Sequence, residues 1–450
     1  MEKSCIFAMS LMEKSCKLML KRKIYNELTK WKDRKDKKAL LIQGARQVGK
    51  TTTIRDFGNK HYRHFVEINF EKTPLAKQAF AGNKDTGTII LNLSAMGYGP
   101  FTKGETLIFF DEIQSCPDAR TAIKFLVEDG SYDYIESGSL LGINYRDVSS
   151  YPVGFEHRID MYPLDFEEFL WASGISDDVI SQLHANYVSV TPVADFLHER
   201  IMDKFRQYMV VGGMPEAVAT FTGNKDLSET LQIQKDIITS YRDDISKYAG
   251  SDRQLARLVF DAIPLQLSKE DKRFVLADIE KGASQRKYGD ATQWLADAGV
   301  AYFSYNTKTF ELPFAFGEKR NLYKLFMLDT GLLCSLCLPQ MQFHVLNGDI
   351  NINEGALTEN YVACELVRKG VALNYYDRKS KQELDFVFQE NQGISVIEVK
   401  SGNDYMRHAS LDAAMNSFHD RIERAMVLSK FNVMKKDGVA YYPLYMTMFF

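Results

Sequence analysis

The chain has 450 residues, of which 45% are hydrophobic and 26% charged, and its formal net charge is −3. This composition indicates a globular protein without the overall positive charge of a general nucleic-acid binder, and the length predicts more than one domain. The longest apolar runs, such as "TLIFF" and "YMVVGGM", are far too short to cross a membrane, and the six cysteines are scattered as in a reducing compartment. We therefore expect a cytoplasmic protein with no membrane partner.

The N-terminal segment is locally basic. Residues 1–38 hold twelve Lys/Arg against five Asp/Glu, which predicts a basic helix in front of the first domain. A solvated helix face and a phosphate-contacting face both fit this pattern.

A phosphate-binding loop follows directly. The sequence "ALLIQGARQVGKTTTI" reads as an apolar strand over 39–43, a GxxxxGKT motif over 44–51, and the start of a helix. Glycines let the backbone wrap around an anion, Lys50 would reach the β- and γ-phosphates, and Thr51 would ligate Mg²⁺. The predicted ATP contacts are Gly44, Ala45, Arg46, Gln47, Val48, Gly49, Lys50, Thr51 and Thr52.

A second strand ends in two acids, as nucleotide hydrolysis requires. "ETLIFFDEIQ" places Asp111 and Glu112 after an apolar run. Asp111 is predicted to hold the Mg²⁺ shell and Glu112 to polarise the attacking water. The next predicted strand, "YDYIESGS", offers Ser137 as the residue that senses the γ-phosphate, with Ser139 close behind.

The middle of the chain reads as helices followed by a hairpin. Residues 191 to about 250 alternate charged and apolar positions at helical spacing, interrupted by "GGMP". The order helix, Gly299, strand, strand suits a winged helix-turn-helix with a wing near "NTKT". Such a module would serve as the ATPase lid or would contact DNA through Arg286 and Lys287.

The C-terminal segment carries one acid in a predicted helix, a second at the start of a predicted strand, and an acid and a lysine together on the next strand. Glu359 lies in an amphipathic helix, Asp385 enters an apolar strand, and "SVIEVKSG" places Glu398 and Lys400 on one face of the next strand. Asp385 and Glu398 offer hard oxygen ligands for Mg²⁺, Glu359 would complete the shell, and Lys400 would help to deprotonate a water. We expect strands 384–388 and 394–399 to be neighbours, with Lys400 between the two carboxylates.

The motifs together resemble a known family. The P-loop, "FFDEIQ", "ESGS", "MYPLDFEEFL" and "VVGGMPEAV" are similar to prokaryotic AAA+-related P-loop ATPases that carry a C-terminal domain of unknown function with a PD-(D/E)xK nuclease-like fold. Many members of that family place Gly-Arg shortly before "YPL", and the arginine of that pair would serve as an arginine finger. This chain has Gly154-Phe155 instead. The arginine finger therefore stays unassigned among Arg120, Arg146 and Arg158.

The resemblance implies an α/β protein in four parts. These are a basic N-terminal helix (1–38), a RecA/AAA-like ATPase core (39–190), a helical and winged-helix lid (191–340) and a restriction-endonuclease-like domain (341–450). The expected function is ATP hydrolysis with Mg²⁺, coupled to a domain that acts on or recognises DNA or other nucleic acid. The alternative is an ATP-dependent regulatory switch whose C-terminal domain is a non-catalytic binding module. The oligomeric state is left open.

Overall fold

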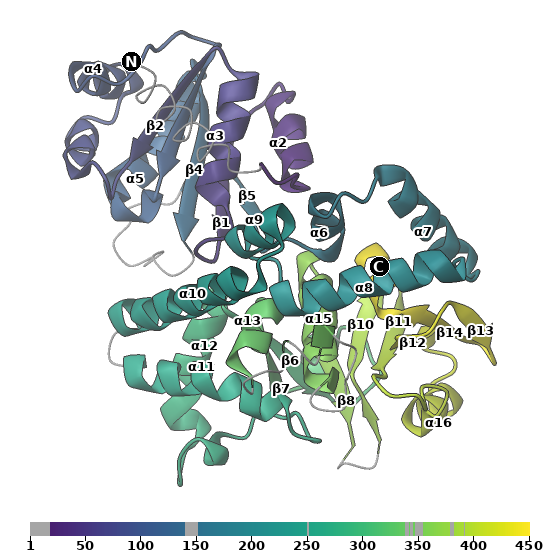
Figure 1. The fold of residues 1–450 in the computed structure, drawn as a ribbon. Helices are drawn as coiled ribbons and strands as arrows, with labels where there is room; N and C mark the ends of the chain where they lie inside the picture. Colours follow the sequence, from purple (N-terminus) through teal and green to yellow (C-terminus); the bar gives the residue numbers. More distant parts are fainter. Residues whose placement is uncertain are drawn as a thin grey trace.

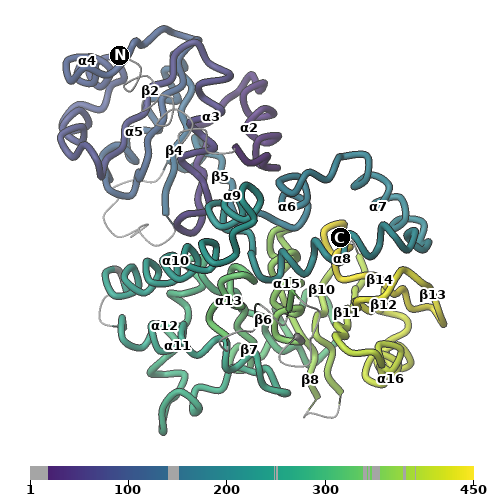
Figure 2. Tube along the Cα trace, viewed as in Figure 1, coloured from purple at the N-terminus to yellow at the C-terminus, as the bar shows by residue number. Residues whose placement is uncertain are grey.

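The protein forms two lobes in the computed structural model, which describes residues 19–139, 152–249, 252–337, 342, 345–346, 354–378, 382–390 and 392–450 (Figure 1). The first lobe contains the N-terminal sheet and its helices. The chain then passes through a group of helices into a second lobe that ends at the C-terminus, as the tube in Figure 2 shows. The predicted α/β class is confirmed.

The first lobe is built on five parallel strands. They are β1 (Ala39–Gly44), β2 (His64–Asn69), β3 (Thr106–Asp111), β4 (Asp133–Ser139) and β5 (Glu156–Asp160), in the order β2-β3-β4-β1-β5. All four strand pairs are parallel. The strand β4 therefore lies between β1 and β3, so the P-loop strand and the acid-bearing strand are both its neighbours.

Helices cover both faces of this sheet, which explains why its central strands are apolar on both sides. They are α2 (Ile24–Lys32), α3 (Lys50–His61), α4 (Thr86–Ala95) and α5 (Pro117–Asp129). Leu40 and Ile42 of β1 share one buried cluster with residues of α2 and α3. Ala39 and Leu41 of the same strand belong to a second cluster with residues of α4 and α5. The period-two alternation of the strand thus sorts its side chains between two helix layers.

The helices that follow β5 lead from the first lobe to the second, and the later ones pack against the strands of the second lobe. They are α6 (Phe166–Ala172), α7 (Asp177–Ser189), α8 (Asp195–Val211), α9 (Pro215–Asn224), α10 (Leu227–Tyr248), α11 (Arg253–Leu267), α12 (Gln285–Asp297) and α13 (Thr330–Leu336). Short 3-10 helices occur at Pro74–Phe80, Ile113–Ser115, Leu276–Asp278, Phe314–Phe316 and Leu444–Phe449. None of the helices in the described part of the chain is long and apolar enough to cross a membrane.

The second lobe contains two sheets. The first, in the order β7-β6-β8-β9, consists of β6 (Ala301–Thr307), β7 (Glu318–Met327), β8 (Asn374–Asp377) and β9 (Glu383–Leu384). The second, in the order β10-β11-β12-β14-β13, consists of β10 (Phe386–Glu390), β11 (Gly393–Val399), β12 (Ile422–Ser429), β13 (Met434–Lys436) and β14 (Val439–Pro443). This sheet is mixed, and α15 (Glu354–Arg368) and α16 (Ala409–Ser417) complete the lobe.

The predicted wing differs from the hairpin that the chain forms. Strands β6 and β7 pair as an antiparallel hairpin after α12, but β6 also pairs in parallel with β8. The hairpin is therefore half of a sheet shared with residues beyond the predicted boundary at 340/341. At its tip, Phe310 is buried against Tyr376 instead of projecting as a wing. Lys287, predicted as a DNA contact, is paired with Glu280 at 2.8 Å.

Two glycines allow the close approach that joins the lobes. A Cβ at Gly213 would lie 2.0 Å from the Leu164 carbonyl oxygen, and one at Gly212 would lie 2.2 Å from the Asp329 carboxylate. The Gly213 amide donates to Asp329 at 2.6 Å, and the Leu164 amide donates to the Gly213 carbonyl at 2.7 Å. The "GGMP" interruption between α8 and α9 thus fits a backbone packed against backbone.

We expect Gly213→Ala to lower the melting temperature by roughly 5 °C, because the added methyl group overlaps a backbone oxygen that cannot move without breaking the junction. Gly223→Ala is the matched control, since that exposed helical position has no atom near an added Cβ. Thermal unfolding of the two variants measures the difference. Equal melting temperatures would contradict the close-packing role of Gly213.

Candidate functional site

The P-loop connects β1 to α3 with two residues in the left-handed region. Gln47 has φ 63° and Gly49 has φ 96°, and α3 begins at Lys50. A side chain at Gly44 is excluded because its Cβ would lie 2.1 Å from the Met161 carbonyl oxygen. The motif therefore keeps its first glycine for packing against the segment after β5 and its second for backbone conformation.

Lys50 is folded back over the loop. Its Nζ donates to the carbonyl oxygens of Gly44 at 2.9 Å and Ala45 at 2.8 Å. Burial lowers the pKa of Lys50 to about 8, although Glu112 and Asp111 act in the opposite direction. An anion would interact with this buried amine more strongly than the two carbonyl oxygens do, so the site favours a negatively charged ligand.

Asp111 is the centre of the polar network at the end of the sheet. Its carboxylate accepts hydrogen bonds from the Thr51 hydroxyl at 3.0 Å, from the Asn69 amide at 2.7 Å, and from the Ser137 hydroxyl. The four side chains come from α3, β2, β3 and β4. Asn69 was missed by the sequence analysis, although it lies opposite Asp111 in the strand register and ends a strand as Asp111 does.

Glu112 adopts a conformation that is rare for a residue other than glycine. Its φ is 55°, and its carboxylate accepts a hydrogen bond from the Gln114 amide at 2.5 Å. Burial raises the pKa of Glu112, and the neighbouring Asp111 adds to the effect. Backbone strain and a raised pKa at the end of an acid-bearing strand are both features of functional carboxylates.

The remaining P-loop residues are held from outside the loop. Arg46 forms an ion pair with Asp244 of α10 at 2.5 Å, and the Tyr241 hydroxyl donates to the Arg46 carbonyl at 2.8 Å. On the other side, Arg22 donates to the Val48 carbonyl at 2.9 Å. Gln47 and Thr52 are both exposed. Helix α10 and the segment before α2 therefore fix the loop between them.

The two arginine-finger candidates that the structure describes differ in burial and in ion pairing. Arg120 is buried and paired with both Glu136 and Glu156, so its guanidinium is already committed inside the first lobe. Arg158 is 47% exposed and pairs with Glu156 at 2.7 Å. Arg146 lies outside the described residues.

The C-terminal acids converge as the strand pairing requires. Strands β10 and β11 are antiparallel, with Phe386 opposite Ile397, so the predicted neighbourhood of 384–388 and 394–399 is confirmed. Asp385 lies just before β10, and its carboxylate accepts a hydrogen bond from the Val399 amide at 2.8 Å. Glu359 reaches the same place from α15. We call Glu359, Asp385 and Glu398 the acid centre.

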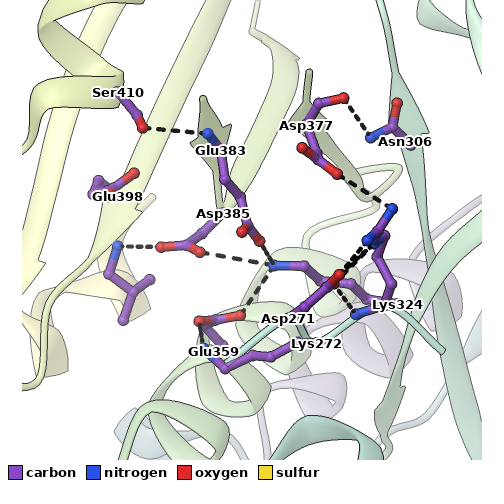
Figure 3. A network of polar contacts seen from close by, with 12 residues as sticks. Asp271, Lys272, Asn306, Lys324, Glu359, Asp377, Glu383, Asp385, Glu398 and Ser410 are labelled. Carbon is purple, nitrogen blue, oxygen red and sulfur yellow. Dashed lines mark hydrogen bonds and ion pairs between the residues drawn. The ribbon is translucent and has the colours of Figure 1, made fainter. Parts of the chain in front are cut away.

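Two lysines from outside the predicted C-terminal domain enter the acid centre (Figure 3). Lys324 of β7 is fully buried, and its Nζ lies 2.8 Å from Glu383, 3.4 Å from Glu359 and 3.8 Å from Asp385. Lys272 pairs with Glu359. The sequence analysis missed both, although a single lysine within the apolar strand "LYKLFM" is an unusual residue to bury.

The expected place of Lys400 was therefore wrong. Its Nζ donates to Glu398 at 2.6 Å, but the ion pair to Asp385 is made by Lys324 instead. Lys400 lies at the end of β11 and is partly exposed, whereas Lys324 approaches through the interior. The position of the interior amine depends on the pairing of β6 with β8, which no local pattern indicates.

The pKa values of the carboxylates in the acid centre are shifted in different directions. Burial raises the pKa of Asp385 well above its usual range, and Glu359 and Glu398 add to the shift. Burial also raises the pKa of Glu398. At Glu359 the effect of burial is outweighed by Lys324 and Lys272, so its pKa is lowered.

The fit of this centre to a metal ion is poor. Among the described residues, no three His, Cys, Asp or Glu side chains are arranged as ligands of one ion. One Glu398 oxygen is buried without a hydrogen-bond partner, but Glu359 is engaged by two lysines. By contrast, Thr51 and Asp111 place a hydroxyl and a carboxylate side by side next to the P-loop, which suits the oxygen ligands that Mg²⁺ prefers.

Comparison with family models divides the chain into three matched segments. Residues 36–170 match the model of an AAA domain. Residues 202–342 and 354–446 match two domains of unknown function, DUF8612 and DUF4143. No curated protein matches the chain.

Solved structures with a related arrangement are distant. A Walker-type ATPase of Pyrococcus abyssi is 15% identical, with 71% of this chain and 96% of that chain covered and a TM-score of 0.44. The Aeropyrum pernix Orc1 protein in complex with DNA is 12% identical, covers 73% and 91%, and has a TM-score of 0.25. Thermotoga maritima RuvB is 13% identical, covers 63% and 89%, and has a TM-score of 0.29.

The first lobe is thus an AAA-related P-loop ATPase domain. That class follows from the family match together with the parallel sheet, the P-loop between β1 and α3, and the acids at the end of β3. The two segments that follow have no established function.

We expect Arg120→Met to destabilise the protein by about 3–5 kcal/mol, because the two largely buried carboxylates of Glu136 and Glu156 lose the buried guanidinium that they share. Arg158→Met is the matched control, since Arg158 is far more exposed. Thermal unfolding should show a large loss for the first variant and little change for the second. A stable Arg120→Met protein that has lost ATP hydrolysis would instead support a catalytic arginine.

Proposed function

We propose that this chain hydrolyses ATP as a regulatory switch whose nucleotide state acts on the C-terminal lobe. The observation that carries the proposal is the convergence of Lys50, Thr51, Asp111 and Ser137 at one edge of the parallel sheet. These residues provide, in one place, an amine for phosphate, oxygen atoms for a cation and a polar sensor.

Binding would use the loop and the helix behind it. The amides of the P-loop and the N-terminus of α3 attract the phosphates, and Lys50 would exchange its two carbonyl contacts for phosphate oxygens. Mg²⁺ bound with ATP would neutralise phosphate charge, and Thr51 and Asp111 would hold it. Asn69 would keep the Asp111 carboxylate oriented.

Hydrolysis would depend on Glu112. A carboxylate with a raised pKa is a better proton acceptor, and Gln114 holds its side chain in place. Ser137 hydrogen-bonds to Asp111 from the strand between the P-loop and the acids, so it would report a change at the γ-phosphate to the rest of the sheet.

The nucleotide state would reach the second lobe by two routes. Arg46 of the P-loop is tied to Asp244 of α10, so a loop that closes on phosphate pulls on a helix that packs against α11 and α13. At α6, the Phe166 amide donates to Glu365 of α15, and Glu365 pairs with Arg368. Helix α15 also carries Glu359 of the acid centre, six residues before Glu365.

We expect Glu112→Gln to bind ATP with nearly unchanged affinity and to lose turnover by about two orders of magnitude or more, because only the proton acceptor is removed. Lys50→Ala is the contrasting variant and should lose ATP affinity. Phosphate release and nucleotide-binding titrations on the full chain separate the two effects. Normal turnover in Glu112→Gln would require another base, and normal hydrolysis in Lys50→Ala would remove the ATP assignment.

Metal-dependent cleavage of nucleic acid is the second candidate function. It is favoured by Asp385 just before β10 and Glu398 on the neighbouring β11, with Lys400 beside Glu398 and a buried Glu398 oxygen that lacks a hydrogen-bond partner. It is opposed by the lysines that already occupy the acid centre. We therefore rank it below the regulatory switch.

The regulatory proposal predicts that the wild-type chain leaves single- and double-stranded DNA and RNA intact in Mg²⁺ or Mn²⁺, with and without ATP. The measurement is end-labelled substrate resolved by gel electrophoresis, with Asp385→Asn as the paired variant. Cleavage by the wild type that Asp385→Asn abolishes would establish the nuclease instead. Cleavage that survives in Asp385→Asn would come from a contaminant.

A further inference from the structure

The acid centre is almost neutralised by the chain's own amines. Among the described residues, Lys324 pairs with the carboxylates of Glu359, Glu383 and Asp385, and Lys272 also pairs with Glu359. The remaining acid, Glu398, pairs with Lys400. A site for a divalent cation depends on carboxylate charge that no other cation has balanced. Here almost all of that charge is balanced by lysine.

Lys324 is the amine that occupies the interior position. Its Nζ is within 4 Å of three carboxylates, which come from α15, from β9 and from Asp385 between β9 and β10, and its side chain is completely buried. The ammonium also lies 5.1 Å from the centre of the Tyr375 ring, on β8. Figure 3 shows the amine between Glu383, Asp385 and Glu359.

The backbone of β7 fixes the position of the Lys324 side chain. Lys324 lies in the middle of β7, with Ser304 of β6 opposite it, and both flanking residues of the strand are buried. Withdrawing the amine would leave the buried carboxylates of Glu359 and Asp385 with less compensating positive charge, which is unfavourable in the interior. The position is therefore fixed by the fold, in contrast to Lys400, whose side chain is partly exposed.

We propose that Lys324 stands in for the divalent cation in the acid centre, so that this site is closed to Mg²⁺ and Mn²⁺ and acts as an ionic joint between β7, α15 and the β9–β10 segment. A doubly charged ion among the same oxygens would lie close to the fixed positive charge of Lys324, whose side chain is fully buried. The repulsion between the divalent ion and the Lys324 ammonium, which would share the same carboxylate oxygens, outweighs the attraction to one additional carboxylate ligand. The inference does not depend on the ATPase assignment.

Removing the amine should open the site. Lys324→Met keeps most of the side-chain length but leaves Asp385, Glu359 and Glu383 without their shared cation. The excess negative charge then attracts a divalent ion from solution. Lys324→Arg is the matched control, because it keeps the positive charge and should leave the site closed.

The experiment measures Mn²⁺ binding to the nucleotide-free full chain by the loss of the free-ion electron paramagnetic resonance signal. The samples are wild type, Asp385→Asn, Lys324→Met, Lys324→Arg and the double variant Lys324→Met/Asp385→Asn. Each protein is compared with its Asp385→Asn counterpart, and the difference in bound Mn²⁺ is the binding at the acid centre. Any Mn²⁺ bound at the P-loop contributes equally to both and drops out of the difference. Circular dichroism and melting curves establish that each variant is folded.

We expect wild type and Asp385→Asn to give the same titration. Lys324→Met should bind one additional Mn²⁺ roughly a hundredfold more tightly than the wild-type acid centre, and Asp385→Asn should abolish that gain. Mn²⁺ binding by the wild type that Asp385→Asn removes would overturn the proposal. So would a folded Lys324→Met protein without the additional ion. If Lys324→Met does not fold, the comparison of the wild-type and Asp385→Asn titrations still tests whether the wild-type acid centre binds Mn²⁺.

Discussion

The carboxylate of Asp111 is the constraint on which the first lobe depends. A nearly buried carboxylate needs hydrogen-bond donors, and Asp111 takes them from Thr51, Asn69 and Ser137. Those donors can meet only if β2, β3 and β4 end at the same edge of one parallel sheet and α3 starts beside them. The strand order that satisfies Asp111 is also the order that brings the P-loop amine and the acids together, so stability and nucleotide chemistry share one geometric condition.

A second ionic constraint organises the other lobe. Lys324 is fully buried, and such an amine is tolerated only where carboxylates surround it. The carboxylates come from a helix and strands beyond residue 350, whereas the lysine comes from β7, before it. The two segments matched by separate domains of unknown function are therefore joined by a shared sheet and a shared ionic cluster. Motion between them would expose charges that the interior has paired.

The junction between the lobes combines a rigid contact with polar ones. At Gly212 and Gly213 the backbone packs too closely for any other side chain, which holds α8 and α9 against the Leu164 segment and Asp329. The P-loop contact of Arg46 with Asp244 is a partly exposed ion pair that a phosphate could replace. The junction thus combines a close backbone contact with an ion pair between the P-loop and α10, which is the arrangement on which the proposed switch rests.

The sequence by itself determined the elements whose signals are local. The glycine spacing and Lys50-Thr51 predicted the turn from β1 into α3, and the apolar run before Asp111 predicted a buried strand, because backbone conformation and strand burial depend on adjacent residues. The pairing of strands β10 and β11 was also predictable, since only a short turn separates them. Tertiary structure alone decided which distant side chains meet. Asn69 at Asp111, the buried pairing of Arg120, and Lys324 in the acid centre all follow from strand order. Strand order is set by long-range packing, which has no signature in a short stretch of sequence.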